Sequence, residues 1–329
     1  MTPLPKTLQA TFLASALAIA LFPLANSPFY IELVTKIMIM AIFAMSLDLL
    51  VGYTGLVSFG HAAYFGIAAY AVVLISPKYE AASLWLTLPA SVLIAAASAF
   101  VIGLFVLRTK GIYFIMVTLA FAQMVYFLFH DTGLGGGSDG TYLNFKPEAK
   151  LAGYTLFDLG NTRHFYYFVF ALMLLVYLFL RRLLQSPLGR AFIGIKVNEH
   201  RMWSLGYPVL RYKLASFTIA GGLGGLAGYL AACQFGFVNP EILSWHQSGN
   251  VLLMVILGGM GTLYGPIAGA FAFVMMQEYF SALTKHWQLL MGGLIVLVVL
   301  FFPGGLASLA DRFKTRGVKK PVVAEAKHG

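Results

Sequence analysis

Long apolar runs separated by short polar stretches dominate the pattern of this chain. A helix needs about 20 mostly apolar residues to cross the hydrocarbon core of a bilayer, which is roughly 30 Å thick. Measured against that length, the pattern predicts ten membrane-spanning helices, at residues 8–25, 30–50, 61–76, 84–107, 111–129, 164–184, 208–232, 247–262, 264–283 and 287–302. The predicted fold class is therefore all-α, a polytopic transmembrane helical bundle of about ten spans.

The first predicted span has a second interpretation. Lys6 precedes it and small residues lie near Ala25, which also fits a secretory signal peptide. Nine further apolar runs follow, so a bundle inserted in the membrane is predicted in either case.

The composition narrows the class of protein. Of the 329 residues, 60% are hydrophobic and only 10% are charged, whereas a soluble domain carries roughly a quarter charged residues. These figures exclude a water-soluble enzyme, and they exclude a disordered chain because disorder requires low hydrophobicity and high charge. The single cysteine, Cys233, excludes a disulfide framework and a metal site built from several cysteines. A membrane protein remains.

The basic residues indicate the orientation of the bundle rather than a nucleic-acid partner. The formal net charge is +10, and most lysines and arginines lie in a few segments between the apolar runs. If the N-terminus is inside, these segments face the cytoplasm, as the positive-inside bias requires. The predicted organisation is a transmembrane domain over residues 1–310 and a basic cytoplasmic tail over 311–329, solvated by water or by anionic membrane lipid.

Two connecting segments are too long to be simple turns. Residues 130–163 form a predicted outside loop rich in Gly, Asp and Thr. Residues 186–206 form a segment on the inside that is predicted to be a helix. Pro187 is suited to the first helical turn, and Gly206 is suited to the left-handed conformation that ends a helix. Such a helix can lie on the bilayer surface or dock into the groove of a partner, and its periodicity leaves both possibilities open.

The usual enzyme signatures are absent from the sequence. No Gly-Lys pair occurs, so a phosphate-binding loop with its lysine is excluded. The seven histidines include no pair four residues apart, so no metalloprotease helix motif is present. We therefore predict no enzyme activity, no metal and no cofactor held by this chain.

Charged residues inside the predicted spans are candidates for function, because a charge in the membrane is costly. Glu32 and Lys36 lie near the outer end of the second span, Asp48 near its inner end, and Glu278 in the ninth. For Glu32, Lys36 and Glu278 the simpler interpretation is that the side chain reaches the interface. Asp48 either caps a turn or pairs with a neighbour, or it lines a solute path.

Glycine-rich stretches interrupt two of the predicted spans. The first covers residues 52–66 and the second covers residues 258–266. Helices broken at membrane depth survive where protein or a water-filled cavity satisfies the freed backbone groups, and transporters use such breaks to present helix ends to solutes. Two breaks in one chain favour a solute path, although tight helix packing is the alternative.

At these residues the sequence resembles the permease subunits of ABC importers for branched-chain amino acids, of the LivM type. The likeness covers roughly residues 30–310. The matching motifs, in order, are Gly52–Ala63, Arg108–Phe114 with Val117–Ala120, Gly136–Gly140, Ser186–Arg190 with Asn198–Glu199, and Gly258–Thr262.

The resemblance implies a set of partners. Two permeases, this chain and a second one of LivH type, would sit on two ATP-binding cassette ATPases in the bacterial inner membrane. A periplasmic solute-binding protein would deliver the solute. ATP would be bound by the ATPase subunits, which accounts for the missing nucleotide site.

The resemblance also assigns residues 186–206 as the segment that couples to an ATPase. Polar contacts at Arg190 and Glu199 and apolar anchors at Phe192 and Ile195 are implied. The full set of implied coupling residues is Gly189, Arg190, Phe192, Ile195, Glu199 and Gly206. Residues 200–203 depart from the small residues usual in the family, which puts the choice of ATPase in doubt.

The breaks and the resemblance together predict a path for a branched-chain or related amino acid. Its predicted lining is Gly52, Tyr53, Gly55, Ser58, Gly60, His61, Tyr64, Tyr113, Thr118, Gly259, Gly261 and Tyr264. For His61 the alternative is a hydrogen-bonded packing residue. Spans two to five and seven to ten start from opposite sides, as an inverted repeat requires.

Three other functions remain open from the sequence. Related permeases carry urea, amides or aromatic acids, so the solute is less certain than the class of transporter. A secondary carrier working alone would need an intramembrane carboxylate, for which Asp48 and Glu278 are the candidates. A purely structural scaffold would not depend on the glycine breaks.

Overall fold

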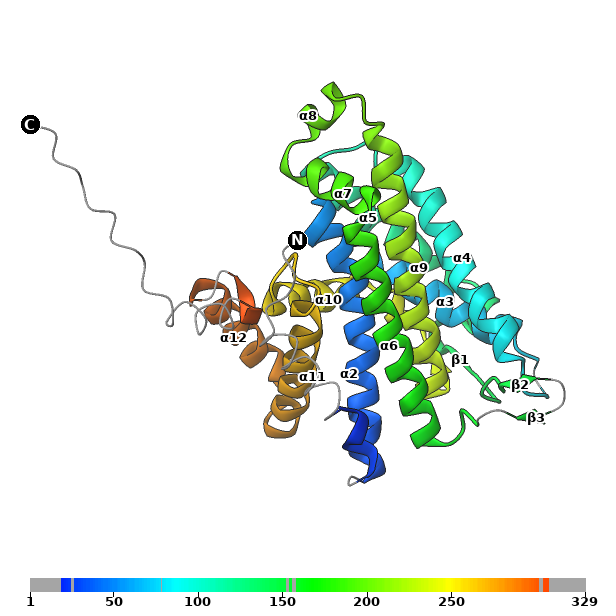
Figure 1. The fold of residues 1–329 in the computed structure, drawn as a ribbon. Helices are drawn as coiled ribbons and strands as arrows, with labels where there is room; N and C mark the ends of the chain where they lie inside the picture. Colours follow the sequence, from blue (N-terminus) through cyan, green and yellow to red (C-terminus); the bar gives the residue numbers. More distant parts are fainter. Residues whose placement is uncertain are drawn as a thin grey trace, which may run out of the picture.

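The chain is mostly helical in the computed structural model, which describes residues 19–24, 27–77, 79–151, 154–155, 158–301 and 304–307 (Figure 1). The longer helices are α2 (Pro28–Asp48), α3 (His61–Ile75), α4 (Leu84–Val106), α5 (Ile112–His130), α6 (Thr162–Gln185), α7 (Pro187–Val197), α9 (Val209–Phe235), α10 (Trp245–Gly258), α11 (Gly265–Leu283) and α12 (Trp287–Phe301). The short elements are η1 (Phe22–Leu24), the π-helix η2 (Leu49–Thr54), η3 (Gly133–Gly135), η4 (Gly137–Asp139), β1 (Thr141–Tyr142), β2 (Lys150–Leu151), β3 (Tyr154–Thr155), α8 (Glu199–Ser204), β4 (Phe237–Val238) and η5 (Pro240–Leu243).

The second to tenth predicted spans each coincide, within about four residues, with a helix of the structure. Among the described residues, five helices are long and apolar enough to cross a membrane: Pro28–Thr54, Leu84–Val106, Ile112–His130, Thr162–Gln185 and Val209–Phe235. The apolar helices α3 and α12 are shorter. The all-α membrane bundle is thus confirmed, while the count of ten spans and the inverted repeat remain predictions. Most of the first predicted span and the whole of the tail 311–329 lie outside the described residues.

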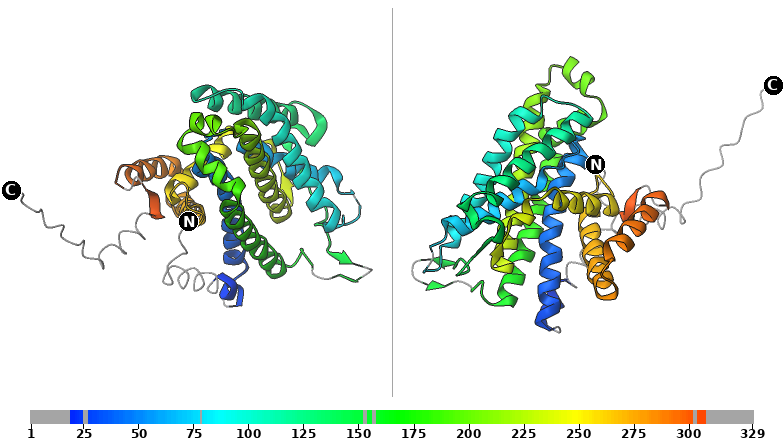
Figure 2. Two further views of the ribbon diagram at one scale, coloured as in Figure 1. Left: turned by 45° about the horizontal axis from the view of Figure 1, so that its top comes forward. Right: turned by 180° about the vertical axis from the view of Figure 1, so that it is seen from behind.

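Helix α2 occupies the centre of the bundle. It packs against α6 and α9 on one side and against α10 and α11 on the other (Figures 1 and 2). Together with η2 it forms the most buried of the five long spans, with 89% of its most apolar window inside the protein. A helix that is apolar all round is expected in such a position.

Small residues allow the neighbouring helices to approach α9 closely. A Cβ atom at Gly228 would overlap the carbonyl group of Phe65 in α3, and one at Gly225 would overlap Ala95 in α4. Lipid is as apolar as the helices, so the hydrophobic effect does not hold helices together in a membrane. Small residues at the interface instead let the backbones approach and make close van der Waals contact. The run Gly221–Gly228 is therefore a packing surface for α3 and α4.

The polar segments gather at opposite ends of the bundle (Figure 1). Helices α7 and α8 lie at one end, which we call the α8 end, and the small strands lie at the other, which we call the β1 end. At the β1 end, β1 pairs antiparallel with β4, and Thr141 is opposite Val238. Residues 141–142 of the predicted loop therefore pair with the connection between α9 and α10.

Both predicted helix breaks are present. Helix α2 widens into η2, which Gly55 ends with a φ of 79°, and α3 begins again at His61. The second break lies between α10 and α11, where Gly259 and Gly261 have φ values of 112° and 78°. A left-handed φ is rarely adopted by other residues, so glycine at these positions stops each helix.

The segment 186–206 differs from the single helix that the sequence predicts. Its ends are as predicted, with Pro187 in the first turn and Gly206 at a φ of 83°. Inside it, Asn198 adopts an extended conformation, and its side-chain oxygen accepts a hydrogen bond from the N–H of Arg201 at 2.9 Å. Asn198 thus ends α7 and caps α8, because a capping side chain competes with the continuing helix.

Candidate functional site at the helix breaks and the α8 end

The two helix breaks and the segment 186–206 meet in one cluster of polar contacts. Lys196 of α7 donates a hydrogen bond from Nζ to the carbonyl oxygen of Gly52 in η2, at 2.6 Å. Gly261 donates its N–H to Oδ1 of Asp48 at 2.8 Å. We call Asp48, Gly52, Lys196 and Gly261 the break cluster. It joins three segments that are far apart in the sequence.

The geometry of the break cluster explains its glycines. A Cβ atom at Gly52 would overlap Oδ1 of Asp48 and lie 2.5 Å from the backbone nitrogen of Gly261. A π-helix leaves backbone carbonyls displaced from the regular helical ladder, and such turns are often found at functional sites. Here the carbonyl oxygen of Gly52 is the acceptor for Nζ of Lys196. A close approach of this kind requires glycine.

Asp48 is almost fully buried beside Lys196. Its Oδ1 is paired with Gly261, while its Oδ2 has no hydrogen-bond partner among the described residues. The bond to Gly261 agrees with the interpretation that Asp48 pairs with a neighbour, and a place for Asp48 on a solute path stays a prediction.

A second group of predicted path residues holds the start of α3 in place. Thr118 of α5 accepts a hydrogen bond from the N–H of Phe59 at 3.2 Å, and Ser58 accepts one from Gly60 at 3.2 Å. A Cβ atom at Gly60 would lie 2.5 Å from the carbonyl oxygen of Thr118. These residues fix the turn between η2 and α3.

His61 and Tyr64 are packing residues in this structure. Nε2 of His61 lies 2.8 Å from Oγ of Ser46, and its ring stacks on Phe43. Tyr64 is buried edge-on against Phe217. The contacts of His61 agree with the alternative of a packing histidine, and the lining of a path by His61 and Tyr64 stays a prediction.

The remaining predicted path residues are dispersed. Tyr113 is 77% exposed on the surface of α5, away from the break cluster. Tyr53 is buried near Leu263 and Tyr264, and Gly55 packs on the stem of Lys196. The structure thus brings together only part of the predicted set.

The coupling residues are also arranged differently from the prediction. Phe192 and Ile195, expected as anchors for a partner, are 0% and 3% exposed and belong to the core of this chain. Gly189 is buried against the end of α6, because a Cβ atom there would overlap Leu183 and Leu184. Arg190 is exposed, and so is Gly206. The buried residues attach the segment to its own bundle.

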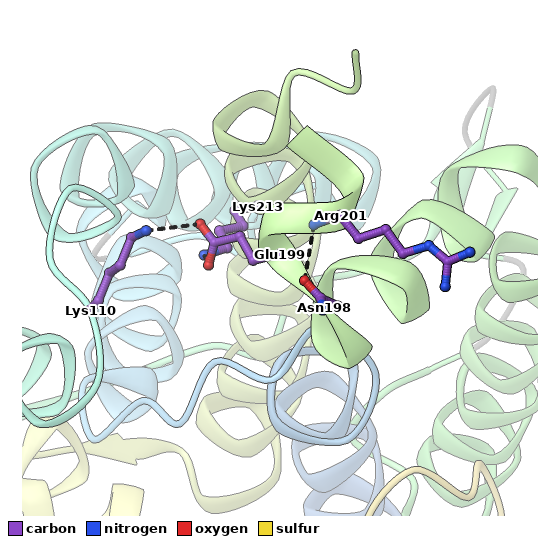
Figure 3. Close-up of polar contacts among 5 residues, drawn as sticks. All are labelled: Lys110, Asn198, Glu199, Arg201 and Lys213. Carbon is purple, nitrogen blue, oxygen red and sulfur yellow. Dashed lines mark hydrogen bonds and ion pairs between the residues drawn. The ribbon is translucent and has the colours of Figure 1, made fainter. Parts of the chain in front are cut away.

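Glu199, expected to contact a partner, is paired within the chain (Figure 3). Its carboxylate lies 2.7 Å from Nζ of Lys213 in α9 and 3.4 Å from Nζ of Lys110 in the turn before α5. Partial burial of the carboxylate raises the pKa of Glu199, but the hydrogen bond and charge of Lys213 and the charge of Lys110 outweigh it. The pKa of Glu199 therefore lies below its ordinary value, and the carboxylate ties α8 to two other elements.

A cavity that the sequence analysis missed opens near the β1 end. Its volume is about 290 Å³, and it lies between α2, α3, the end of α9, η5 and the start of α10. None of the predicted path residues lines it. The signal in the sequence is the polar stretch His246–Asn250, which opens the eighth apolar run with side chains unusual for a membrane span.

The segment 29–300 matches a family model described as a branched-chain amino acid transport system permease component. The high-affinity branched-chain amino acid transport system permease protein LivM of Escherichia coli strain K12 is 34% identical over 318 residues, covering 91% of this chain and 75% of that protein. The chain belongs to this permease family. Like its relatives, it is a transport permease, and its apolar helices are those of a membrane protein.

More distant relatives show how broad the permease family is. A probable branched-chain amino acid transport permease protein LivM of Methanocaldococcus jannaschii is 25% identical, over 66% of this chain and 67% of that protein. An autoinducer 2 import system permease protein LsrC of Photorhabdus laumondii is 29% identical, over 43% of this chain and 44% of that protein. No solved structure matches the chain. Family membership therefore leaves more than one class of solute open.

Proposed function

We propose that this chain is one of two translocating subunits of an ABC importer for branched-chain or related amino acids in the bacterial inner membrane. The complete transporter would contain a second permease of LivH type, two ATPases that bind ATP, and a periplasmic binding protein. The α8 end, with both termini, faces the cytoplasm in this proposal, because basic residues concentrate there.

The observation that carries the proposal is the hydrogen bond between Lys196 and Gly52. Through this bond a segment at one end of the bundle contacts the backbone of a helix break. A displacement of α7 therefore acts directly on η2, and through Asp48 on the break that contains Gly261. In the proposed mechanism, closure of the ATPases moves α7 and α8, and the two breaks respond together to open and close the path.

The proposed docking surface consists of exposed apolar residues at the α8 end. Val197, Trp203 and Leu205 are largely exposed, although they lie on short helices next to polar residues. Exposed apolar patches of this kind mark contacts with a partner or with lipid. With the exposed Arg190, they replace Phe192 and Ile195 as the residues offered to an ATPase.

Reconstitution tests the proposal. The two permeases with their ATPases in liposomes should import leucine when ATP is inside and loaded binding protein is outside, and ATP hydrolysis should rise when the loaded binding protein is added. If ATP hydrolysis does not respond, or if this chain alone accumulates leucine, the proposal is wrong.

A secondary carrier is the second candidate, because Oδ2 of Asp48 is buried without a partner among the described residues. In such a carrier the carboxylate would bind the coupling proton or ion. Asp48→Asn should then abolish uptake while the response of the ATPases persists. The importer proposal instead expects uptake and ATP hydrolysis to fall together, with Glu80→Gln, at an exposed carboxylate outside the spans and the break cluster, as the matched control.

A further inference from the structure

The cavity near the β1 end has one polar and one apolar wall. The polar wall consists of η5 and the first turns of α10, with Glu241, Ser244, His246, Gln247 and Asn250. The apolar wall is formed by α2, α3 and the end of α9, with Met40, Phe65, Ala231, Ala232 and Phe235. A cavity divided in this way fits a ligand that is polar at one end and apolar at the other.

The size of the cavity limits the ligand to a small molecule. Its volume of about 290 Å³ lies at the lower end of the range for ligand pockets, roughly 300–1,000 Å³. Helix α10 has 14 residues and so rises only about 21 Å, too short to cross the hydrocarbon core. Its polar first turns line the cavity, where a polar ligand can satisfy their side chains.

The polar wall of the cavity has one carboxylate and two side-chain amides, which can bind groups of opposite charge. Glu241 is the only carboxylate that lines the cavity, and it forms no ion pair within the described part of the chain. A carboxylate in this position can accept hydrogen bonds from an ammonium group. Gln247 and Asn250 are three residues apart, hence on the same face of α10, and their amide groups can donate to a carboxylate.

From this arrangement we infer that the cavity is a solute-binding site for an α-amino acid with an apolar side chain. Glu241 binds the ammonium group, Gln247 and Asn250 bind the carboxylate, and the side chain rests on Phe65, Ala231 and Phe235. The inference deepens the proposed function and rests on it, since it places the imported solute at one site. It also favours a zwitterion over urea or a sugar-like solute, which lack the ammonium group.

The site lies where a solute entering from the β1 end would arrive. Val238, which pairs with Thr141 of the loop 130–163, contributes to its lining. At the inner side, Nε2 of Gln247 lies 3.9 Å from Sδ of Met40, which links α10 to the central helix α2. The occupied site therefore touches both α2 and α10, each of which leads directly into one of the two breaks.

A cysteine placed in the cavity reports occupancy without depending on transport. Ala231→Cys adds a thiol to the apolar wall, and Ser83→Cys places one on the surface at the same end as a control. The parent chain sets the background, because its single cysteine, Cys233, is buried. The probe is the rate of alkylation by a small maleimide in the reconstituted complex.

Millimolar leucine should slow the alkylation of Ala231→Cys at least tenfold and leave Ser83→Cys unaffected. Isocaproate, which has the same apolar chain and carboxylate but no ammonium group, should protect much less. Adding Glu241→Gln should remove this preference for leucine, whereas Glu80→Gln, an exposed carboxylate at the same end, should preserve it.

The outcomes separate the site from the function. If the complex imports leucine but leucine does not protect Ala231→Cys, or if Glu241→Gln keeps full preference for leucine, the inferred site is wrong and the proposed function stands. If leucine protects the cysteine but ATP drives no uptake, the site stands and the importer proposal is wrong.

Discussion

Lys196 shows how one side chain can connect distant parts of this permease. Its stem packs on Gly55 and its ammonium group reaches the carbonyl of Gly52, so two glycines of the first break contact a residue of α7. A hydrogen bond from a charged group contributes about 1.5–3 kcal/mol. Removing it should therefore disturb transport more than assembly.

Lys196→Met keeps the length of the stem and removes the hydrogen bond. We expect roughly tenfold slower ATP-driven uptake, the loss that about 1.4 kcal/mol produces, with normal copurification of the ATPases. Lys285→Met, at an exposed lysine, is the matched control. Unchanged uptake in Lys196→Met would show that this hydrogen bond does not couple the movement of α7 to transport.

Gly228 tests the close packing of α9 at the residue scale. An added methyl group would overlap the carbonyl group of Phe65, and overpacking of a core costs about 1–3 kcal/mol. Gly228→Ala should lower the melting temperature of the purified protein in detergent by roughly 5 °C. Gly292→Ala, where no atom lies within 4 Å, should not lower it.

At the scale of elements, α8 is held by charge rather than by apolar burial. The helix has six residues, none of them buried, and Glu199 ties it to Lys110 and Lys213. So short a helix is not stable by itself in water. The position of α8 therefore depends on the ionised carboxylate.

This dependence predicts an effect of pH. Because the pKa of Glu199 is lower in the folded protein than its ordinary value of 4.5, the ion pairs contribute full stability above pH 4.5. That contribution is lost as the pH falls through the lowered pKa. Hydrogen exchange of residues 199–206, corrected for intrinsic rates, should accelerate in acid, whereas Glu199→Gln should show the faster exchange at every pH.

At the scale of the whole molecule, the α8 end presents apolar residues that the bundle does not cover. Trp203 is 73% exposed, and Val197 and Leu205 are exposed beside it. Lipid could cover part of this surface, but the short helices carry charged residues between the apolar ones. A protein partner with a partly apolar groove fits both kinds of residue.

Trp203→Glu should reduce copurification of the ATPases at least tenfold while membrane insertion stays normal, because a buried charge at the centre of an interface is costly. Tyr79→Glu, a substitution at another largely exposed aromatic residue near the other end, is the control. Full copurification of the Trp203→Glu variant would place the ATPase contact elsewhere, with Arg190→Glu as the next variant to test.

Much of the architecture follows from the pattern of the sequence. Apolar runs placed nine helices within about four residues of their observed bounds, because helix length is set by apolar content. The breaks at residues 52–66 and 258–266, and the ends of the segment 186–206, follow from glycine and proline, whose backbone preferences are local. These features depend on residues that are close along the chain, so they can be predicted from a single sequence.

Which side chains face the interior depended on the packing of helices from distant segments. Phe192 and Tyr113 are both aromatic and both lie in predicted functional motifs, yet one is buried and the other is exposed. Glu199 could not be assigned to Lys110 and Lys213 by spacing, because 89 and 14 residues separate them in the chain. The partners of a side chain across a bundle are set by helix contacts that no local pattern encodes.

The sequence by itself thus determined that this protein is a helical membrane permease, where its helices lie and where they break, since hydropathy and backbone preference act over short distances. Tertiary structure alone decided that Lys196 reaches Gly52, that Asp48 holds Gly261, and that η5 and α10 enclose a cavity with α2 and α9. These contacts arise when helices remote in sequence pack side by side, which places their polar groups together.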